Sequence, residues 1–347
     1  GISSVPRIGM KTSVIAALLF LTSIGVGAQQ THLLVVVGLG GDDTYRELFH
    51  EWATILIEAA SSRYGLPRER ITYLGEDLEL GPAVIDDRST RENIGSAIES
   101  LADDAQRGDH VMVVIFGHGS SSGAPRVNLP GRDLSVDDFS DLLARLDGRF
   151  VTFVNTASAS GPFVETLSAV DRVVVTATRT GRELNASVFG GYFVRAFDEG
   201  ESEADQNKDR RISILEAFTY ARQKVEQEYE ADGKLLTEHA LLDDNGDGEG
   251  TPQPDPLVGD GMFARTLFFS SGETTVAELA FPDDPELRRL YDERTALEER
   301  VEALQLLKGG TDAERYEQEL ETLLVELALK SRAIREIEEL KRDSEVR

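Results

Sequence analysis

The sequence of 347 residues contains no cysteine. Without thiols the chain forms no disulfide, no thiolate metal site and no cysteine-anchored lipid attachment. The same absence excludes catalysis by a thiolate nucleophile. Any nucleophile in this protein must therefore be something other than a thiol.

Basic side chains are also scarce. There are 36 Lys and Arg residues against 63 Asp and Glu residues, which gives a formal net charge of −27. Such an acidic surface repels nucleic acid and anionic lipid and favours the binding of cations. No basic stripe interrupts it, so we exclude nucleic acid as a partner. Apolar residues make up 40% of the chain, which is enough to build a sizeable core.

The N-terminal segment predicts export. Met10 and Lys11 precede an uncharged apolar run over residues 14–21, and small residues follow as far as Ala28. A basic start, a short apolar stretch and small residues are typical of a secretory signal. The run is shorter than the ~20 residues of a membrane span. We expect cleavage near Ala28, with residues 1–28 removed, and a secreted or periplasmic protein with no membrane span. An uncleaved anchor is the alternative.

Apolar strands alternate with helices over residues 29–272, which we expect to form one domain. The strands are predicted at residues 33–37, 70–74, 110–116, 150–155, 172–176 and 262–269. Asp42, Thr90 and Ser135 are predicted to begin helices. Continuous apolar strands between helices indicate an α/β protein with a mainly parallel sheet of about six strands, flanked by helices. In such sheets, sites lie at the carboxyl ends of the strands.

The C-terminal tail, residues 285–347, is rich in Glu, Leu, Arg and Ala. Its seam repeats by four and three at Tyr316, Leu320, Leu323, Leu327, Lys330, Ile334 and Ile337. Gly309 and Gly310 interrupt the pattern, and Thr311 opens a capping box. We expect an α-helical hairpin or coiled coil through which the protein forms a homo-oligomer. Two solvated helices packed on the core domain are the alternative.

Two strand ends carry the residues of a candidate active site. The strand 110–116 ends at Gly117-His118-Gly119, and the strand 150–155 leads to Ala157-Ser158-Ala159-Ser160-Gly161. A histidine and a hydroxyl at neighbouring carboxyl ends can act as base and nucleophile. The backbone N–H groups of Gly119 and Ser158 are candidate oxyanion donors.

These motifs resemble the legumain-like peptidases and, more remotely, the caspases, over about residues 30–270. The second motif is similar to the family's Ala-Cys-x-Ser-Gly. The resemblance implies a caspase-like fold and a cysteine-type endopeptidase ancestry. It places His118 on the catalytic histidine, Gly119 on an oxyanion donor and Ser158 on the nucleophilic cysteine. Arg46 falls on an arginine that lines the substrate pocket.

The sequence departs from the family at several of these positions. Serine replaces the nucleophilic cysteine, and a serine needs a well-placed base and a group that orients this base. Thr44 stands where the family has an asparagine beside the histidine, and we see no other group that would orient His118. Gly191 and Leu184 stand at the positions of the acidic and hydroxyl groups that read an asparagine side chain. We therefore expect impaired catalysis and do not carry over asparaginyl specificity.

Two acidic loops have the spacing of calcium sites. The first would use Asp205, Asn207, Asp209, the carbonyl of Arg211 and Glu216, and the second Asp243, Asn245 and Asp247. Alternate oxygen ligands closed by a glutamate are typical of an EF-hand loop. Arg210 replaces the usual turn glycine in the first loop, and the second lacks the closing glutamate. We predict calcium as the cofactor and no organic cofactor; a helix cap followed by a turn is the alternative.

Three hypotheses for function remain. The first is an exported peptidase homologue that is catalytically impaired and binds peptides or proteins. The second is an active hydrolase that uses Ser158 as nucleophile and His118 as base. The third is an envelope scaffold protein, in which the acidic domain and the helical tail serve assembly.

Overall fold

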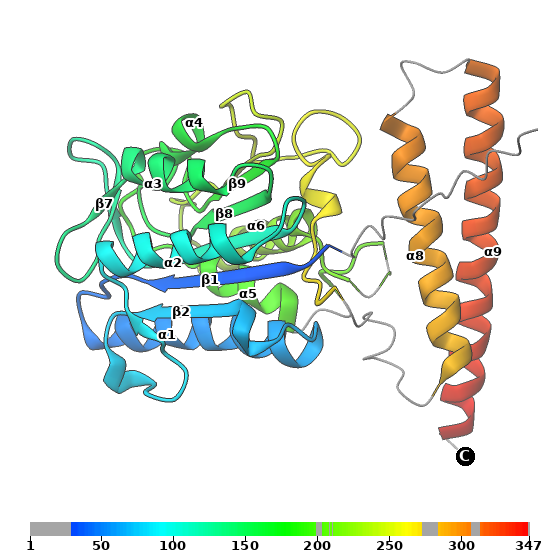
Figure 1. The fold of residues 1–347 in the computed structure, drawn as a ribbon, viewed down its shortest axis with the longest axis horizontal. Coiled ribbons are helices and arrows are strands. Elements are labelled where there is room, and N and C mark those ends of the chain that lie inside the picture. The colour runs from blue at the N-terminus through cyan, green and yellow to red at the C-terminus, as the bar shows by residue number, and fades with distance from the viewer. Residues whose placement is uncertain are drawn as a thin grey trace, which may run out of the picture.

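A computed structural model describes residues 29–198, 203–207, 209, 211–272, 284–306 and 313–345. Its centre is a sheet of seven strands in the order β10-β9-β8-β4-β1-β2-β3 (Figure 1). The strands are β1 (Thr31–Val37), β2 (Ile71–Gly75), β3 (Asp87–Arg88), β4 (His110–Phe116), β8 (Phe150–Asn155), β9 (Arg172–Thr176) and β10 (Leu241–Asp243). β10 runs antiparallel to β9, and the other neighbours pair in parallel. The expected α/β class with a mainly parallel sheet is confirmed.

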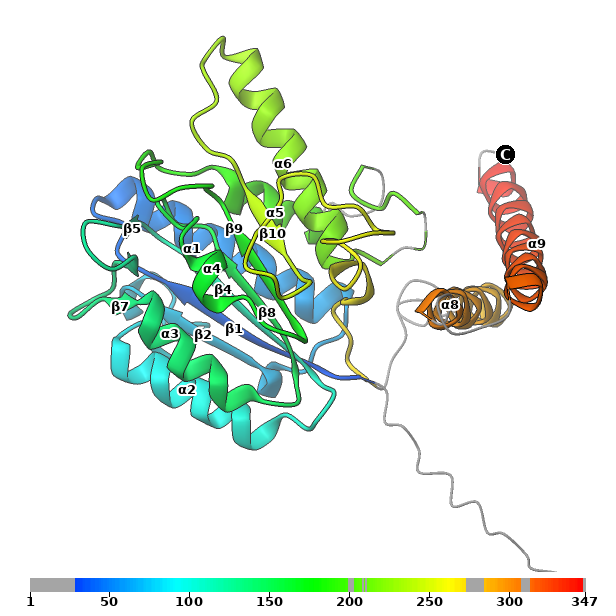
Figure 2. The same ribbon diagram turned by 90° about the horizontal axis from the view of Figure 1, so that it is seen from above.

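Helices cover both faces of this sheet (Figure 2). One layer contains α1 (Asp43–Glu58), α5 (Phe189–Asp198) and α6 (Ile214–Ala231), and the other contains α2 (Arg91–Asp104), α3 (Val136–Leu143) and α4 (Phe163–Leu167). A small antiparallel sheet follows β4 and is built from β5 (Gly119–Ser120), β6 (Arg126–Val127) and β7 (Leu134–Ser135). Short helical turns lie at η1 (Ala59–Arg63), η2 (Arg68–Arg70), η3 (Leu78–Leu80), η4 (Ala144–Leu146) and η5 (Ala264–Thr266).

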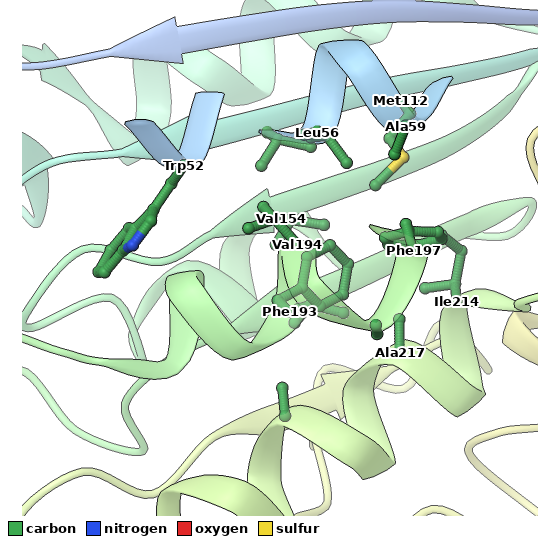
Figure 3. Close-up of a cluster of buried hydrophobic side chains, with 14 of the residues drawn as sticks. Trp52, Leu56, Ala59, Met112, Val154, Phe193, Val194, Phe197, Ile214 and Ala217 are labelled. Carbon is green, nitrogen blue, oxygen red and sulfur yellow. The ribbon is translucent and has the colours of Figure 1, made fainter. Parts of the chain in front are cut away.

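The two helical layers explain why the central strands are largely apolar. Successive side chains of a strand point to opposite faces of the sheet. Leu33 and Val35 of β1 therefore join the core under α1, α5 and α6, whereas Leu34 and Val36 join the core under α2, α3 and α4. Figure 3 shows part of the first core, to which α1 contributes Trp52 and Leu56 and α5 contributes Phe193 and Phe197. Full burial of each such side chain contributes about 1.5–3 kcal/mol.

The three predicted helix starts are confirmed. The Asp42 side chain accepts the N–H of Tyr45, and Thr90 caps α2 in the same way through the N–H of Asn93. Ser135 forms a reciprocal capping box with Asp138 at the start of α3. A side-chain cap of this kind contributes about 1 kcal/mol, because it satisfies an N–H group that the helix cannot.

The prediction of a last strand at 262–269 is wrong. This segment contains the turn η5, and its pairing is the single bridge between Ser213 and Phe268. The cause is the Asp244 carboxylate, which accepts the N–H groups of Gly261, Phe263 and Ala264 at 2.7–2.9 Å and curls the chain. The short strand β10, which the sequence pattern did not indicate, forms the sheet edge instead.

The C-terminal helices α8 (Pro285–Leu306) and α9 (Ala313–Glu345) pack against each other as a hairpin. Two clusters of buried side chains join them, and each cluster combines residues of both helices. Leu287, Leu290 and Tyr291 meet Ile334 in one, and Leu297, Val301 and Leu304 meet Tyr316 and Leu323 in the other. Gly309, Gly310 and Thr311 lie outside the described residues.

The hairpin lies beyond the amino ends of the parallel strands (Figure 1). The guanidinium of Arg211 connects it to the α/β region. This group lies 3.6 Å from the Glu298 carboxylate of α8 and stacks over the ring of Phe268 at 4.2 Å. Within the described part of the chain, no helix combines the length and the apolar character that crossing a bilayer requires.

Candidate functional site

His118 follows β4 at the carboxyl edge of the sheet. Its ring lies edge-on against two aromatic rings of α1, at 4.9 Å from Tyr45 and 5.2 Å from Phe49 between ring centroids. Burial by these rings lowers the pKa of His118 below its ordinary value of 6.5, and a hydrogen bond to the Gly40 backbone opposes this shift. The imidazole is therefore neutral at pH 7, which is the form that a general base requires.

The Gly40 backbone, whose hydrogen bond raises the pKa of His118, is a candidate for the group that orients its ring. Gly40 belongs to the turn between β1 and α1, and its own N–H donates to the Glu76 carboxylate at 2.9 Å. Glu76 is buried at the end of β2, and the Arg46 guanidinium lies 3.5 Å from its other oxygen. A hydrogen bond to one ring nitrogen fixes the tautomer of an imidazole. Sequence reasoning missed this group because it belongs to the backbone, which every residue has.

Ser158 follows β8 and is 3% exposed. Its Oγ lies 3.3 Å from the backbone nitrogen of Gly119, from which it accepts a hydrogen bond, and 3.3 Å from the Gly119 carbonyl, to which it donates. A side chain at residue 119 would lie 2.5 Å from the Ser158 carbonyl oxygen, so this position requires glycine. The structure thus brings Ser158 against the residue that follows His118. The catalytic roles of both side chains stay predictions.

The loop after Ser158 is fixed from both sides. Ala159 has a φ of 56°, a conformation that costs a non-glycine residue about 1–2 kcal/mol. Its N–H donates to the Glu183 carbonyl at 2.8 Å, which holds the turn. The hydroxyls of Ser160 and Thr178 lie 3.2 Å apart and tie the loop to the end of β9. Ser158 is therefore presented on a rigid turn.

Arg46 is connected to this site through Glu76, which accepts the N–H of Gly40. Besides Glu76, its guanidinium binds the carboxylate of Asp43 at 2.6 Å. The negative charge of Glu76 and, to a smaller extent, that of Asp43 raise the pKa of Arg46. Arg46 lines a surface hollow together with Leu39, Glu76, Asp77, Arg88, Pro130 and Gly131. The substrate-binding role of Arg46 stays a prediction.

Gly191 and Leu184 stand at the positions of the family's acidic and hydroxyl groups, and their surroundings differ from each other. A Cβ on Gly191 would lie 2.9 Å from the indole of Trp52, so this ring fills the space into which a longer side chain would point. Leu184 is 65% exposed, and Thr44 is exposed at the start of α1.

The first acidic loop gathers three buried carboxylates. Asp205, Asp209 and Glu216 are 2%, 3% and 7% exposed. Burial, followed by the charges of Asp209 and Asp205, raises the pKa of Glu216. Asp205 accepts the N–H of Asp209 at 3.0 Å, and Asn207 accepts the same N–H at 2.8 Å.

Other polar groups of the same loop use these oxygens as well. Glu216 accepts the N–H groups of Gln206, Asn207 and Ser213, and so caps α6 as the alternative interpretation expected. The Arg211 side chain binds Asp209 at 3.2 Å.

The second acidic loop is more open. Asp243 is buried and accepts the N–H groups of Gly246 and Gly248, whereas Asn245 and Asp247 are exposed. Across the described ranges, no group of three or more His, Cys, Asp or Glu side chains is arranged to hold a metal ion. Calcium binding therefore stays a prediction at both loops.

A small cavity of about 150 Å³ lies between the end of β9 and α6. It is lined by Ala177, Arg179, Phe189, Arg222, Val225, Glu226, Leu236, Glu238, His239, Ala240, Pro252 and Gln253. Glu238 is buried and accepts the N–H groups of Val188 and Phe189, which begins α5. Glu183 connects this cavity to the Ser158 loop, because its carboxylate accepts the N–H of His239 while its carbonyl accepts that of Ala159.

The sequence matches no protein-family model and no curated protein. The structure is similar to that of protein GSU0716 from Geobacter sulfurreducens, with a TM-score of 0.44, 14% identity, and coverage of 70% of this chain and 98% of that one. It is also similar to caspase-1 from Spodoptera frugiperda (TM-score 0.38, 13% identity, coverage 62% and 88%). A further similar structure is drICE (TM-score 0.35, 11% identity, coverage 62% and 87%).

Proposed function

We propose that this protein is an exported peptidase homologue that binds peptides at the carboxyl edge of its sheet and turns them over poorly. The observation that carries the proposal is the hydrogen bonding of Ser158. Its hydroxyl donates to the Gly119 carbonyl, and it occupies the Gly119 N–H that an oxyanion would need. A serine attacks only when a base takes its proton. Here the proton is directed to a backbone carbonyl, which is no base.

One observation favours the second candidate, an active serine hydrolase. His118 is kept neutral by burial and is held by the Gly40 backbone. A neutral, oriented imidazole next to a hydroxyl supports serine chemistry in unrelated folds. Rotation of the Ser158 hydroxyl toward His118 would free the Gly119 N–H for an oxyanion.

Four proteins distinguish these functions: the wild type and the variants Ser158→Cys, Ser158→Ala and Ser160→Cys. Each is incubated with a broad peptide library, and cleavage and binding are measured separately. We expect background cleavage by the wild type and by Ser158→Ala, and peptide binding by both. Ser158→Cys should cleave measurably, because a thiol forms its anion far more easily than a hydroxyl. Ser160→Cys is the matched control, since its buried hydroxyl faces Thr178 and not Gly119.

Two results would change the conclusion. Robust cleavage by the wild type that Ser158→Ala abolishes would replace this proposal with the serine hydrolase. Absence of binding to any peptide, in the wild type and in Ser158→Ala alike, would remove the peptide-binding function.

A further inference from the structure

Helix α9 has two seams on opposite sides. The inner seam, which includes Tyr316, Leu323 and Ile334, is buried against α8 of the same chain. The outer seam repeats by three and four at Gln318, Glu321, Val325, Ala328, Arg332 and Arg335, and all six residues are exposed. Positions of this spacing lie along one face of a helix, and helices pack together through such a face where its residues are apolar. The inner seam is already occupied, so the outer seam is the one that a further helix would meet.

The centre of the outer face is apolar. Leu324, Val325 and Leu329 are 47%, 54% and 60% exposed, and Ala328 lies between them on the same face. Ten large apolar side chains are exposed among the described residues, and these three fall within six positions of one helix. Single exposed apolar residues are ordinary, whereas a contiguous group indicates a contact surface.

We propose that the outer seam binds the same seam of a second copy of this chain, with the two α9 helices antiparallel. A two-fold axis between residues 326 and 327 would place Val325 opposite Ala328 and Leu324 opposite Leu329 of the other copy. A small residue then faces a larger one at the centre, so the two helices can approach closely. The same axis puts Glu321 of each copy opposite Arg332 of the other. An isologous contact of this kind closes at a dimer.

The charges select the antiparallel orientation. The seam is acidic on one side of the apolar centre, at Glu321, and basic on the other, at Arg332 and Arg335. A parallel pair would place each of these charges against its own copy, and like charges at such positions oppose pairing. Within one chain, Arg332 binds the exposed Glu336 at 2.8 Å. Such a surface pair contributes little, so Arg332 can bind Glu321 of the second copy as well.

The position of the hairpin suits this assembly. It lies beyond the amino ends of the strands, whereas His118 and Ser158 follow their carboxyl ends (Figure 1). A dimer formed through α9 therefore leaves the candidate site of each copy open. The inference does not rest on the function proposed for that site.

Sedimentation of the full chain over about 1–500 µM tests the contact. We expect the wild type to form a reversible dimer and the double variant Val325→Glu/Leu329→Glu to weaken association by about 10-fold or more, since four carboxylates would meet at the apolar centre. Leu235→Glu is the matched control, because Leu235 is 88% exposed and lies outside the seam. Unchanged helix content by circular dichroism shows that the variants still fold.

Cysteine cross-linking tests the orientation, and the cysteine-free chain gives no background. Residues 321 and 332 of one helix are about 16 Å apart along the axis, too far for a disulfide within a chain. A mixture of Glu321→Cys and Arg332→Cys chains should cross-link between the two variants under mild oxidation. Each variant alone should remain largely uncross-linked.

Three results would overturn the proposal. These are a monomer at every concentration, a dimer that Val325→Glu/Leu329→Glu leaves intact, and cross-linking of Glu321→Cys with itself. The first would leave the apolar face to a different partner, and the third would show parallel helices.

Discussion

The Glu76 carboxylate accepts the backbone N–H of Gly40 at 2.9 Å, and the Gly40 backbone in turn holds the ring of His118. Glu76, directly after β2, therefore holds the residue whose backbone bonds to His118, directly after β4. Arg46 balances the charge of Glu76 from α1.

The first prediction is that Glu76→Ala destabilises the protein by about 1–3 kcal/mol, because a buried N–H group loses its acceptor. Urea unfolding measures this loss. Glu79→Ala is the control, since it removes an exposed carboxylate from the same segment and should change the free energy of unfolding little. Equal stabilities of the two variants would show that Glu76 does not hold the Gly40 turn.

The second prediction concerns export. The mature chain should begin near Gln29, since Ala28 ends the small residues that follow the apolar run. N-terminal sequencing of protein isolated from the secreting cell tests it. Recovery of chains that still begin at or before Met10 would favour an uncleaved anchor.

The third prediction concerns calcium at the first acidic loop. Asp205, Asp209 and Glu216 bury negative charge close together, and a divalent cation would compensate it. Because the loop's own N–H groups use these oxygens, calcium would have to replace some of those hydrogen bonds. Millimolar calcium should raise the melting temperature by a few degrees, since a ligand of the native state stabilises it.

Thermal unfolding with and without calcium, in the wild type and in Asp205→Ala, measures this effect. Asp247→Ala is the comparison for the second loop. If calcium shifts neither the wild type nor Asp247→Ala, the loop is a helix cap, as the contacts of Glu216 with Ser213 allow.

Strands and caps were the part of the fold that the sequence predicted best. β4, β8 and β9 have the predicted limits, because a strand buried on both faces is apolar along most of its length. The caps at Asp42, Thr90 and Ser135 are local side-chain contacts and leave a local signal. The failure at 262–269 has the opposite cause. That segment is apolar like a strand, but Asp244, about twenty residues earlier, sets its conformation.

The candidate site likewise combines features that the sequence predicted with features that it could not predict. The position of Ser158 beside Gly119 follows from the ends of β8 and β4, since neighbouring parallel strands end at one edge of a sheet. The role of Glu76 could not be predicted, because its partner is the backbone N–H of Gly40, which lies in the connection from β1 to α1. The inner seam of α9 was visible as a heptad, and of the two expected forms, hairpin or coiled coil, the structure shows the hairpin with α8 of the same chain.

The fourth prediction concerns acid stability and rests on His110, at the amino end of β4. Its side chain is fully buried, with Nε2 2.9 Å from the Thr152 hydroxyl. The pKa of His110 is lowered from 6.5 to about 4, chiefly by burial; the Phe268 backbone opposes this shift and the nearby His32 adds to it. The direction of the pH dependence of stability follows from proton binding. Between about pH 6.5 and pH 4 the unfolded chain binds a proton at this residue and the native state does not, so stability falls as the pH falls.

The variant His110→Gln keeps a hydrogen-bonding side chain but removes this titration. Between pH 7.5 and pH 5, the wild type should lose about 2 kcal/mol more of its unfolding free energy than the variant does. Buried acids such as Glu216 and Asp260, whose pKa values are raised chiefly by burial, act with the opposite sign. Both proteins contain these acids, so their effect cancels in the difference. Urea unfolding at a series of pH values provides the measurement.

Thr152→Val is the matched control for this experiment. It removes the hydroxyl next to His110 but leaves the imidazole buried, so its stability should still fall with pH as steeply as that of the wild type. Desolvation is the largest cause of the low pKa of His110, and the valine does not relieve it. Parallel pH profiles for the wild type and His110→Gln would show that protonation of His110 does not oppose folding.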